Sequence, residues 1–338
     1  MLFRSGNIAD TGGGAVHNEG ILDMSAAGSA LFENNISSGV SGGFGGGAVY
    51  NTGAIILDSA TFKDNTSLKS GGAVYNANGT LNFDGDAYFS GNTANVNGGA
   101  MFFSGGAAKA SFLKNAVFKN NKASSGRGGA IYMSGASGIN FDSGALFENN
   151  ISSKGGSALY YYASGASTFN FAGNETIFKD NIDLFGGSRV DSGGGAIFAR
   201  TYSSNGAFVF DFSSGKTVFE NNSSGSRGGA VLLINADGGP ATVNSLGKMT
   251  FSGAQTYFLN NKAKEFGGGI YIYIANCTNA RHEVDFSQTD LTVKGNSANT
   301  GSGGFFAIDG GSSVSGNSLL KFGNAVFGGT GEIGRAHV

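Results

Sequence analysis

Residues 62–92 read FKDNTSLKSGGAVYNANGTLNFDGDAYFSGN, and this stretch decides the fold because its parts recur along the chain. It opens with Phe-x-x-Asn, continues with Gly-Gly-Ala-Val-Tyr, and ends at the next Phe-x-x-Asn. Short runs of β-branched and aromatic residues between Gly, Asn and Ser are typical of strands joined by turns. The stretch therefore predicts three short strands, at residues 73–75, 81–83 and 87–89.

Both motifs recur in alternation. Phe-x-x-Asn begins at Phe32, Phe62, Phe89, Phe118, Phe147, Phe178, Phe219 and Phe258, with a weaker copy at Val293/Asn296. Gly-Gly-Ala-aliphatic strings reach Val16, Val49, Val74, Met101, Ile131, Ile197 and Val231, with variants at residues 156–159, 268–270 and 304–306. Successive motif Phe residues lie 27 to 41 residues apart, with the longer intervals late in the chain. A repeat of this length indicates a solenoid in which each copy forms one coil.

A repeat with such short strands cannot bury its apolar face alone, whereas a parallel stack of coils lets each copy cover its neighbour. The middle runs alternate with period two, as at Phe208, Phe210 and Phe212, and no Gly-free window has a helical apolar period. The sequence therefore predicts an all-β fold, a right-handed parallel β-helix. It would have about ten coils of three short strands, in a rod roughly 50 Å long.

Stacked coils would place equivalent residues in columns. The residues after the motif Phe are Glu33, Lys63, Ser90, Lys119, Glu148, Lys179, Glu220 and Leu259, with no like charges adjacent and four neighbouring pairs opposite. Opposite charges on paired strands are favourable, so this column fits in-register stacking. The motif Asn residues would form a hydrogen-bonded ladder in a turn: Asn35, Asn65, Asn92, Asn121, Asn150, Asn181, Asn222 and Asn261. Paired Gly would supply positive φ at the opposite corner.

The composition narrows the function classes. The 338 residues include 61 Gly, 1 Pro and no Trp, with 13% charged residues and a formal net charge of −2. Such a charge disfavours nucleic acid and anionic lipid as partners. Cys277 is the only cysteine, so no internal disulfide can form, and no metal-site spacing or calcium-binding repeat occurs. We expect no metal, no cofactor and no catalytic residue.

We expect the chain to be a fragment with both natural flanks missing. Residues 1–331 form the repeat domain, whereas Glu332 to Val338 break the pattern and are interpreted as a non-native tail. The first residues do not resemble a signal peptide, and no run is apolar over the roughly 18 residues of a membrane span.

The alternating Gly-Gly-Ala-(Ile/Val/Leu) and Phe-x-x-Asn motifs resemble the repeats of the chlamydial-type polymorphic outer membrane proteins, over roughly Gly12 to Phe327. The resemblance implies an autotransporter passenger, a surface β-helix that follows a signal peptide and precedes an outer-membrane β-barrel. It further implies adhesion to a protein or glycan on host or neighbouring cells. The location would be extracellular, on the bacterial outer membrane surface, with the membrane reached only through the missing C-terminal barrel.

Two adjacent columns on the first strand are apolar, and adjacent strand residues face opposite ways. We expect the aliphatic column inward and the next column outward, as an exposed stripe about 30 Å long. The candidate binding residues are Tyr50, Tyr75, Phe102, Tyr132, Tyr160 and Phe198, together with Arg200 and Tyr202. A stacking ladder, or a column covered by a loop, is the structural alternative.

Insertions near residues 183–192, 200–206, 236–247 and 275–283 form a second candidate surface. The polar residues of these insertions could converge on a ligand, and the structural alternative is that they are solvated loop charges. They are Arg189, Asp191, Arg200, Asp237, Arg281, His282 and Glu283.

The alternative function is that of a carbohydrate-active β-helix enzyme, a polysaccharide lyase or hydrolase, because one fold hosts many functions. Such an enzyme needs two carboxylates at a suitable separation in a groove. The acids here are dispersed in turn positions, as at Asp64 and Asp180, which favours a non-enzymatic role.

Overall fold

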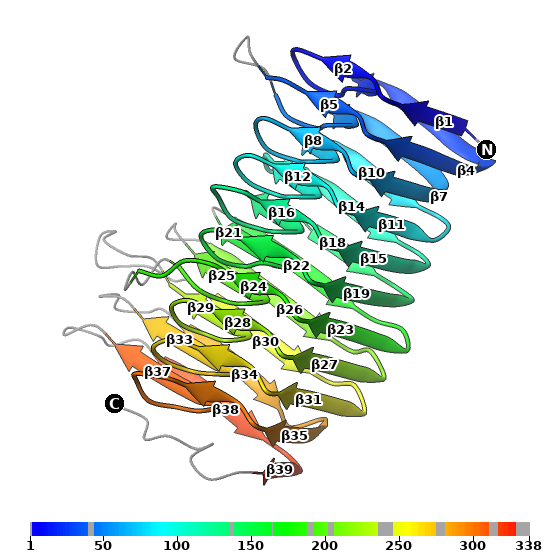
Figure 1. The fold of residues 1–338 in the computed structure, drawn as a ribbon. Helices are drawn as coiled ribbons and strands as arrows, with labels where there is room; N and C mark the ends of the chain where they lie inside the picture. Colours follow the sequence, from blue (N-terminus) through cyan, green and yellow to red (C-terminus); the bar gives the residue numbers. More distant parts are fainter. Residues whose placement is uncertain are drawn as a thin grey trace.

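The computed structural model shows a stack of coils that runs along one axis from the N-terminal to the C-terminal end (Figure 1). It describes residues 2–39, 44–135, 138–163, 165–187, 192–201, 206–235, 246–274, 281–310 and 317–328. Every strand pairing in these ranges is parallel, and every regular element is a strand. The prediction of a parallel β-helix is therefore confirmed.

The strands form three sheets. The Gly-Gly-Ala sheet contains β3 (Val16–Asn18), β6 (Val49–Asn51), β9 (Val74–Ala77), β13 (Met101–Ser104), β17 (Ile131–Ser134), β21 (Leu159–Ala163), β25 (Ile197–Thr201), β29 (Val231–Ile234), β33 (Ile270–Ile274) and β37 (Phe306–Gly310). The short-strand sheet contains β2 (Ile8–Ala9), β5 (Ile36–Ser37), β8 (Thr66–Ser67), β12 (Thr93–Ala94), β16 (Lys122–Ala123), β20 (Ile151–Ser152), β24 (Ile182–Asp183), β28 (Ser223–Ser224), β32 (Lys262–Ala263) and β36 (Ser297–Ala298).

The large sheet has 19 strands and carries both the middle runs and the motif Phe residues. Its strands are β1 (Leu2–Ser5), β4 (Ile21–Glu33), β7 (Ala54–Lys63), β10 (Thr80–Phe83), β11 (Ala87–Ser90), β14 (Lys109–Phe112), β15 (Asn115–Lys119), β18 (Gly138–Phe141), β19 (Gly144–Glu148), β22 (Ala166–Phe171), β23 (Glu175–Lys179), β26 (Ala207–Phe212), β27 (Lys216–Glu220), β30 (Leu246–Phe251), β31 (Gln255–Leu259), β34 (Arg281–Phe286), β35 (Asp290–Lys294), β38 (Asn317–Phe322) and β39 (Ala325–Gly328). β4 and β7 each span both runs, which later coils divide between two strands.

Most coils therefore have four strands, where the sequence predicts three. The additional strand is the two-residue strand that follows the ladder Asn, for example β8. Its residues differ from coil to coil, and its backbone pairs with equivalent residues of both neighbouring coils.

The core is built from two columns of stacked Phe rings on the large sheet. Successive motif Phe residues stack with ring centroids 4.7 Å apart at Phe62 and Phe89 and 4.8 Å apart at Phe89 and Phe118. The middle-run column stacks in the same way, as at Phe83 and Phe112, 4.7 Å apart. Rings of one column meet rings of the other edge-on, which is a favoured aromatic geometry.

The charge column confirms the in-register stacking predicted from the sequence. Glu33 pairs with Lys63, and the Lys63 Nζ lies 2.6 Å from the Glu33 carboxylate. Lys119 and Glu148 also pair, with a separation of 2.9 Å between their charged atoms. These pairs are half-exposed, so each contributes modestly to stability.

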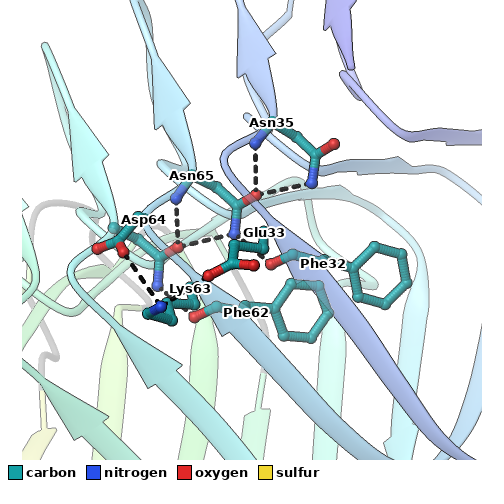
Figure 2. Close-up of polar contacts among 8 residues, drawn as sticks. Phe32, Glu33, Asn35, Phe62, Lys63, Asp64 and Asn65 are labelled. Atoms are coloured by element: carbon teal, nitrogen blue, oxygen red, sulfur yellow. Dashed lines mark hydrogen bonds and ion pairs between the residues drawn. The ribbon is translucent and has the colours of Figure 1, made fainter. Parts of the chain in front are cut away.

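The Asn ladder also forms as predicted. Figure 2 shows one rung, in which Asn65 Oδ1 accepts hydrogen bonds from both the backbone N–H and Nδ2 of Asn35. Asn65 Nδ2 in turn donates to Asn92 Oδ1 and to the carbonyl oxygen of Phe32. The left-handed residue of the turn is the one before the ladder Asn, for example Asp64 with φ of 53°. Asn, Asp or Gly occupies this position in every copy, which are the residues that tolerate it best.

The Gly-Gly corner has two separate requirements. The first glycine adopts positive φ, as at Gly71 with φ of 69°. The second has no room for a side chain, since a Cβ on Gly72 would lie 1.9 Å from the carbonyl oxygen of Gly99 in the next coil. The motif therefore sets both the turn and the close approach of successive coils.

Candidate functional site

The aliphatic column of the Gly-Gly-Ala sheet points into the core, as predicted. Val74, Met101 and Ile131 are at most 1% exposed and belong to the main hydrophobic core. The next column lies on the outer face and forms a continuous aromatic stack. Its rings lie 4.8 Å apart at Tyr75 and Phe102 and 5.0 Å apart at Phe102 and Tyr132.

The expectation of one continuous exposed stripe is wrong at three positions. Tyr50, Tyr160 and Phe198 are buried, at 5%, 1% and 0% exposure. Phe44 stacks on Tyr50 at 4.9 Å, and the guanidinium of Arg127 lies 5.3 Å from the centre of the Tyr160 ring.

The part of the column left only half-buried comprises Tyr75, Phe102 and Tyr132, on β9, β13 and β17. We call these three residues the aromatic stripe. Burial raises the pKa of the Tyr132 phenol further above neutral pH.

Of the other two candidate binding residues, Arg200 is half-buried with its guanidinium 5.9 Å from the Tyr162 ring centre. Tyr202 lies outside the described residues.

Further along the stack, the outer column becomes a second hydrophobic cluster. It consists of Tyr160, Phe198, Leu232, Ile234, Tyr271 and Ala307. Arg227 covers this cluster, with its guanidinium 5.4 Å from both the Phe266 and the Tyr271 ring centres. Its Nε donates to Glu265 at 2.9 Å, so the cation is paired as well as stacked. Arg227 and Phe266, from the corners before β29 and β33, therefore cover this end of the outer column.

The polar insertion residues that the structure describes lie on strands and not in loops. His282 and Glu283 belong to strand β34. His282 is fully buried against Phe208, with ring centroids 5.7 Å apart, so the expectation of a solvated side chain is wrong. It failed because the strand pattern places His282 on the core face. Burial lowers the pKa of His282 to about 4, which keeps the imidazole neutral.

Arg281 is exposed and donates to the Glu283 carboxylate at 3.1 Å. Arg189, Asp191, Asp237 and Cys277 lie outside the described residues.

A pair of carboxylates on the outer face of the large sheet allows the enzyme alternative to be examined. Glu283 and Asp285 both contact the Lys321 Nζ, at 2.7 and 3.3 Å. The Lys321 hydrogen bond lowers the pKa of Glu283. The pKa of Asp285 is also lowered, because hydrogen bonds from Ser287 and Lys321 outweigh its partial burial. Both groups are thus held ionised, whereas glycoside hydrolysis needs one carboxyl that keeps its proton.

One carboxyl does have a raised pKa, but it is inside the rod. Asp183 on β24 is 2% exposed, and burial raises its pKa to about 7. It accepts hydrogen bonds from the Phe185 backbone N–H at 3.1 Å and from Ser224 Oγ at 3.0 Å. Its burial separates it from any bulk substrate. Among the described residues, no group of three or more His, Cys, Asp or Glu side chains is placed to hold a metal ion.

The sequence reasoning missed a second amide ladder, on the inner face of the first coils. Asn18 Nδ2 donates to Asn51 Oδ1 at 2.7 Å, and Asn51 Nδ2 donates to Asn76 Oδ1 at 2.8 Å. The signal was available as Val-x-Asn at the same place in three successive repeats. Phe103 replaces the Asn in the next coil, where the ladder ends.

The described residues include no helix long and apolar enough to cross a membrane. Searches of curated proteins and of solved structures gave no significant match. The model of the Chlamydia polymorphic membrane protein repeat matches at residues 59–77, 115–134, 216–233 and 255–273. Each match runs from the motif Phe strand through the ladder Asn to the Gly-Gly corner and its strand. The chain therefore contains four segments that match the Chlamydia polymorphic membrane protein repeat, and these support its relation to that repeat family.

Proposed function

We propose that this chain is the surface-displayed passenger of an autotransporter and that it acts in adhesion, without enzymatic activity. It would bind a protein or glycan on a host cell or a neighbouring cell, outside the bacterial outer membrane. The observation that carries the proposal is the aromatic stripe. Three adjacent coils hold Tyr75, Phe102 and Tyr132 half-buried, with part of each ring accessible, at fixed spacing on one sheet.

Partly accessible aromatic side chains suit binding because they supply apolar contact area at a low entropic cost. The stripe is held by ring stacking on both sides of Phe102 and by parallel strand pairing beneath it. Its conformation is therefore fixed before a partner arrives, which reduces the ordering cost of association. Tyr75 and Tyr132 add hydroxyl groups that can select a polar partner.

The purely structural interpretation is that the stack only stabilises the coils, and it predicts a different experimental result. Purified chain, immobilised on beads, is tested for binding to cultured epithelial cells. The test variant carries Tyr75→Ala, Phe102→Ala and Tyr132→Ala, and the control carries Tyr88→Ala, an exposed aromatic on the large sheet. We expect the triple variant to lose binding and the control to keep it.

Thermal unfolding of each variant shows whether the rod remains folded. A folded triple variant that binds cells as well as the original chain would overturn the role of the stripe. Single substitutions serve if the triple variant does not fold, since unchanged binding by all three would overturn it equally.

A further inference from the structure

The outer face of the large sheet carries a hollow that is separate from the aromatic stripe. Its volume is about 530 Å³, and it extends over β10, β14, β18 and β22. The lining residues are Thr80, Asn82, Gly106, Lys109, Ala110, Ser111, Gly138, Asn140, Ala166 and Thr168. One column contains Lys109, Gly138 and Thr168 on neighbouring strands. This column is open at its centre because Gly138 has no side chain.

The side chains that line the hollow carry hydroxyls, amides, one ammonium group and the methyl groups of Ala110 and Ala166. Asn140 accepts a hydrogen bond from Asn170 Nδ2 at 2.8 Å. Thr80, Asn82, Ser111 and Thr168 make no side-chain hydrogen bond to other described residues, and Lys109 makes no ion pair with them. Several donors and acceptors therefore face the hollow without partners in the described part of the chain.

We propose that this hollow binds a short acidic oligosaccharide, with Lys109 contacting its carboxylate or sulfate. The amides of Asn82 and Asn140 and the hydroxyls of Ser111 and Thr168 would hydrogen-bond the sugar hydroxyls. Polar groups repeat from coil to coil at about 4.8 Å, a spacing that lets successive coils contact successive sugar units. This site is independent of the aromatic stripe, which lies on a different sheet.

Other classes of ligand fit the hollow less well. A peptide could not add as a strand, because β10, β14, β18 and β22 are each paired on both sides. The lining also lacks aromatic and large aliphatic side chains, so it has no pocket for an apolar anchor. Nucleic acid would require many cations, and the lining contains one.

An apolar side chain borders the hollow at one end of the Asn82 column, and another borders it at the far end of the Lys109 column. On β7, Ile56 pairs with Asn82, and on β26, Val209 pairs with Thr168. Beyond β26 the face is occupied by the ion pairs of Lys248, Glu283 and Lys321. In the column of Asn140, Asn170 is followed by Asp211 on β26, and this carboxylate would repel an acidic ligand. The four coils from β10 to β22 therefore remain, which suits a short oligosaccharide.

The test measures binding of trigalacturonate, 3′-sialyllactose and a heparin tetrasaccharide to the full chain by calorimetry, with cellotriose and lactose as neutral probes. We expect at least one acidic probe to bind and the neutral probes to bind more weakly. Lys109→Gln removes a charge-assisted hydrogen bond, so Kd for the acidic probe should rise about tenfold or more. Ser111→Trp fills the hollow from an outward position and should abolish binding.

Two substitutions in the same columns serve as matched controls. Lys248→Gln lies in the column of Lys109, and Thr250→Trp lies in the column of Ser111, both on β30 and outside the hollow. Both should leave Kd unchanged. Binding of no acidic probe at millimolar concentration, or unchanged binding in Lys109→Gln and Ser111→Trp, would overturn the proposal.

The stripe variant separates this proposal from the adhesion proposal. The folded Tyr75→Ala, Phe102→Ala, Tyr132→Ala chain should keep oligosaccharide binding.

Discussion

A single ladder asparagine satisfies several buried groups at once. Asn121 Oδ1 accepts from the backbone N–H and from Nδ2 of Asn92, at 3.1 and 3.0 Å. Its own Nδ2 donates to Asn150 Oδ1 and to the carbonyl oxygen of Phe89. Such a network is favourable when complete, because an unpaired polar group in the interior is costly.

Asn121→Ala should therefore be strongly destabilising. The substitution removes the partner of three groups, the N–H and Nδ2 of Asn92 and the carbonyl oxygen of Phe89. At about 1–3 kcal/mol for each unsatisfied group, the free energy of unfolding should fall by about 3 kcal/mol or more. Urea denaturation measures it. Asn82→Ala, which removes an amide without such bonds, should change stability by less than about 0.5 kcal/mol. Equal effects of the two substitutions would contradict the ladder's role.

The second corner glycine gives another prediction at this scale. Gly72→Ala places a methyl group 1.9 Å from the Gly99 carbonyl oxygen, so successive coils must separate. We expect a loss of about 1–3 kcal/mol or more, read from the denaturation midpoint. Gly20→Ala is the control, because a Cβ there meets nothing within 4 Å. A neutral Gly72→Ala variant would show that the corner does not fix the coil spacing.

At the scale of the strand, the two Phe columns contribute more than buried area. Phe118 stacks on Phe89 and Phe147, at 4.8 and 4.9 Å, and meets Phe112 and Phe141 edge-on. Aromatic pairs of this kind contribute about 0.5–1.5 kcal/mol beyond the hydrophobic effect. The columns therefore favour Phe over an aliphatic residue of similar size.

Phe103 offers a matched comparison for this effect. Both Phe103 and Phe118 are fully buried, but Phe103 makes no ring contact with another described aromatic side chain. Phe118→Leu should lower the free energy of unfolding by about 1–3 kcal/mol more than Phe103→Leu. Equal losses of unfolding free energy in the two variants, measured by calorimetry, would show that the Phe column contributes only ordinary hydrophobic packing.

The motif strands could be predicted from the sequence because the same residues define their position in every repeat. The short-strand sheet could not, because its outward positions hold Ile36, Thr66, Lys122 and Ser223 in different coils. Its pairing depends on backbone already placed by the ladder Asn, and not on strand-forming side chains. Tertiary context outweighs local preference in such a segment.

At the scale of the whole molecule, two buried titratable groups change the pH dependence of folding stability in opposite directions. Asp183 has its pKa raised to about 7, so between about pH 4 and 7 the folded state binds more protons than the unfolded state. This contribution to stability is present at low pH and is lost as pH rises. His282 has its pKa lowered to about 4, so the unfolded state binds more protons between about pH 4 and 6.5. Its contribution is lost as pH falls.

Each group changes the free energy of unfolding by about 1.4 kcal/mol per pH unit, and the two changes have opposite signs. Asp183→Asn should leave the His282 effect alone, so that variant should lose stability as pH falls from 6.5 to 4.5. His282→Leu should show the reverse and gain stability over the same interval. Denaturation midpoints at pH 4.5, 5.5 and 6.5 check both signs. Parallel pH profiles in the two variants would contradict the buried state of these groups.

The location of the aromatic column could be predicted from the sequence, but its exposure could not. Column membership follows from the repeat, whereas exposure depends on side chains that reach from other corners. Phe44 covers Tyr50, and Arg127 covers Tyr160 in the coil that follows its own. Neither Phe44 nor Arg127 recurs at its position in every repeat, so no periodic signal marks them. The hollow depends similarly on one non-periodic residue, Gly138.

The ladder hydrogen bonds also have a consequence for how the chain folds. They join asparagines 27 to 41 residues apart, about a tenth of the 338-residue chain. A relative contact order this low is usual for helical bundles and unusual for all-β proteins, which tend to fold slowly. Once two coils are docked, each further coil closes only a short loop on a finished template. Growth should then proceed coil by coil, with formation of the first pair as the slow step.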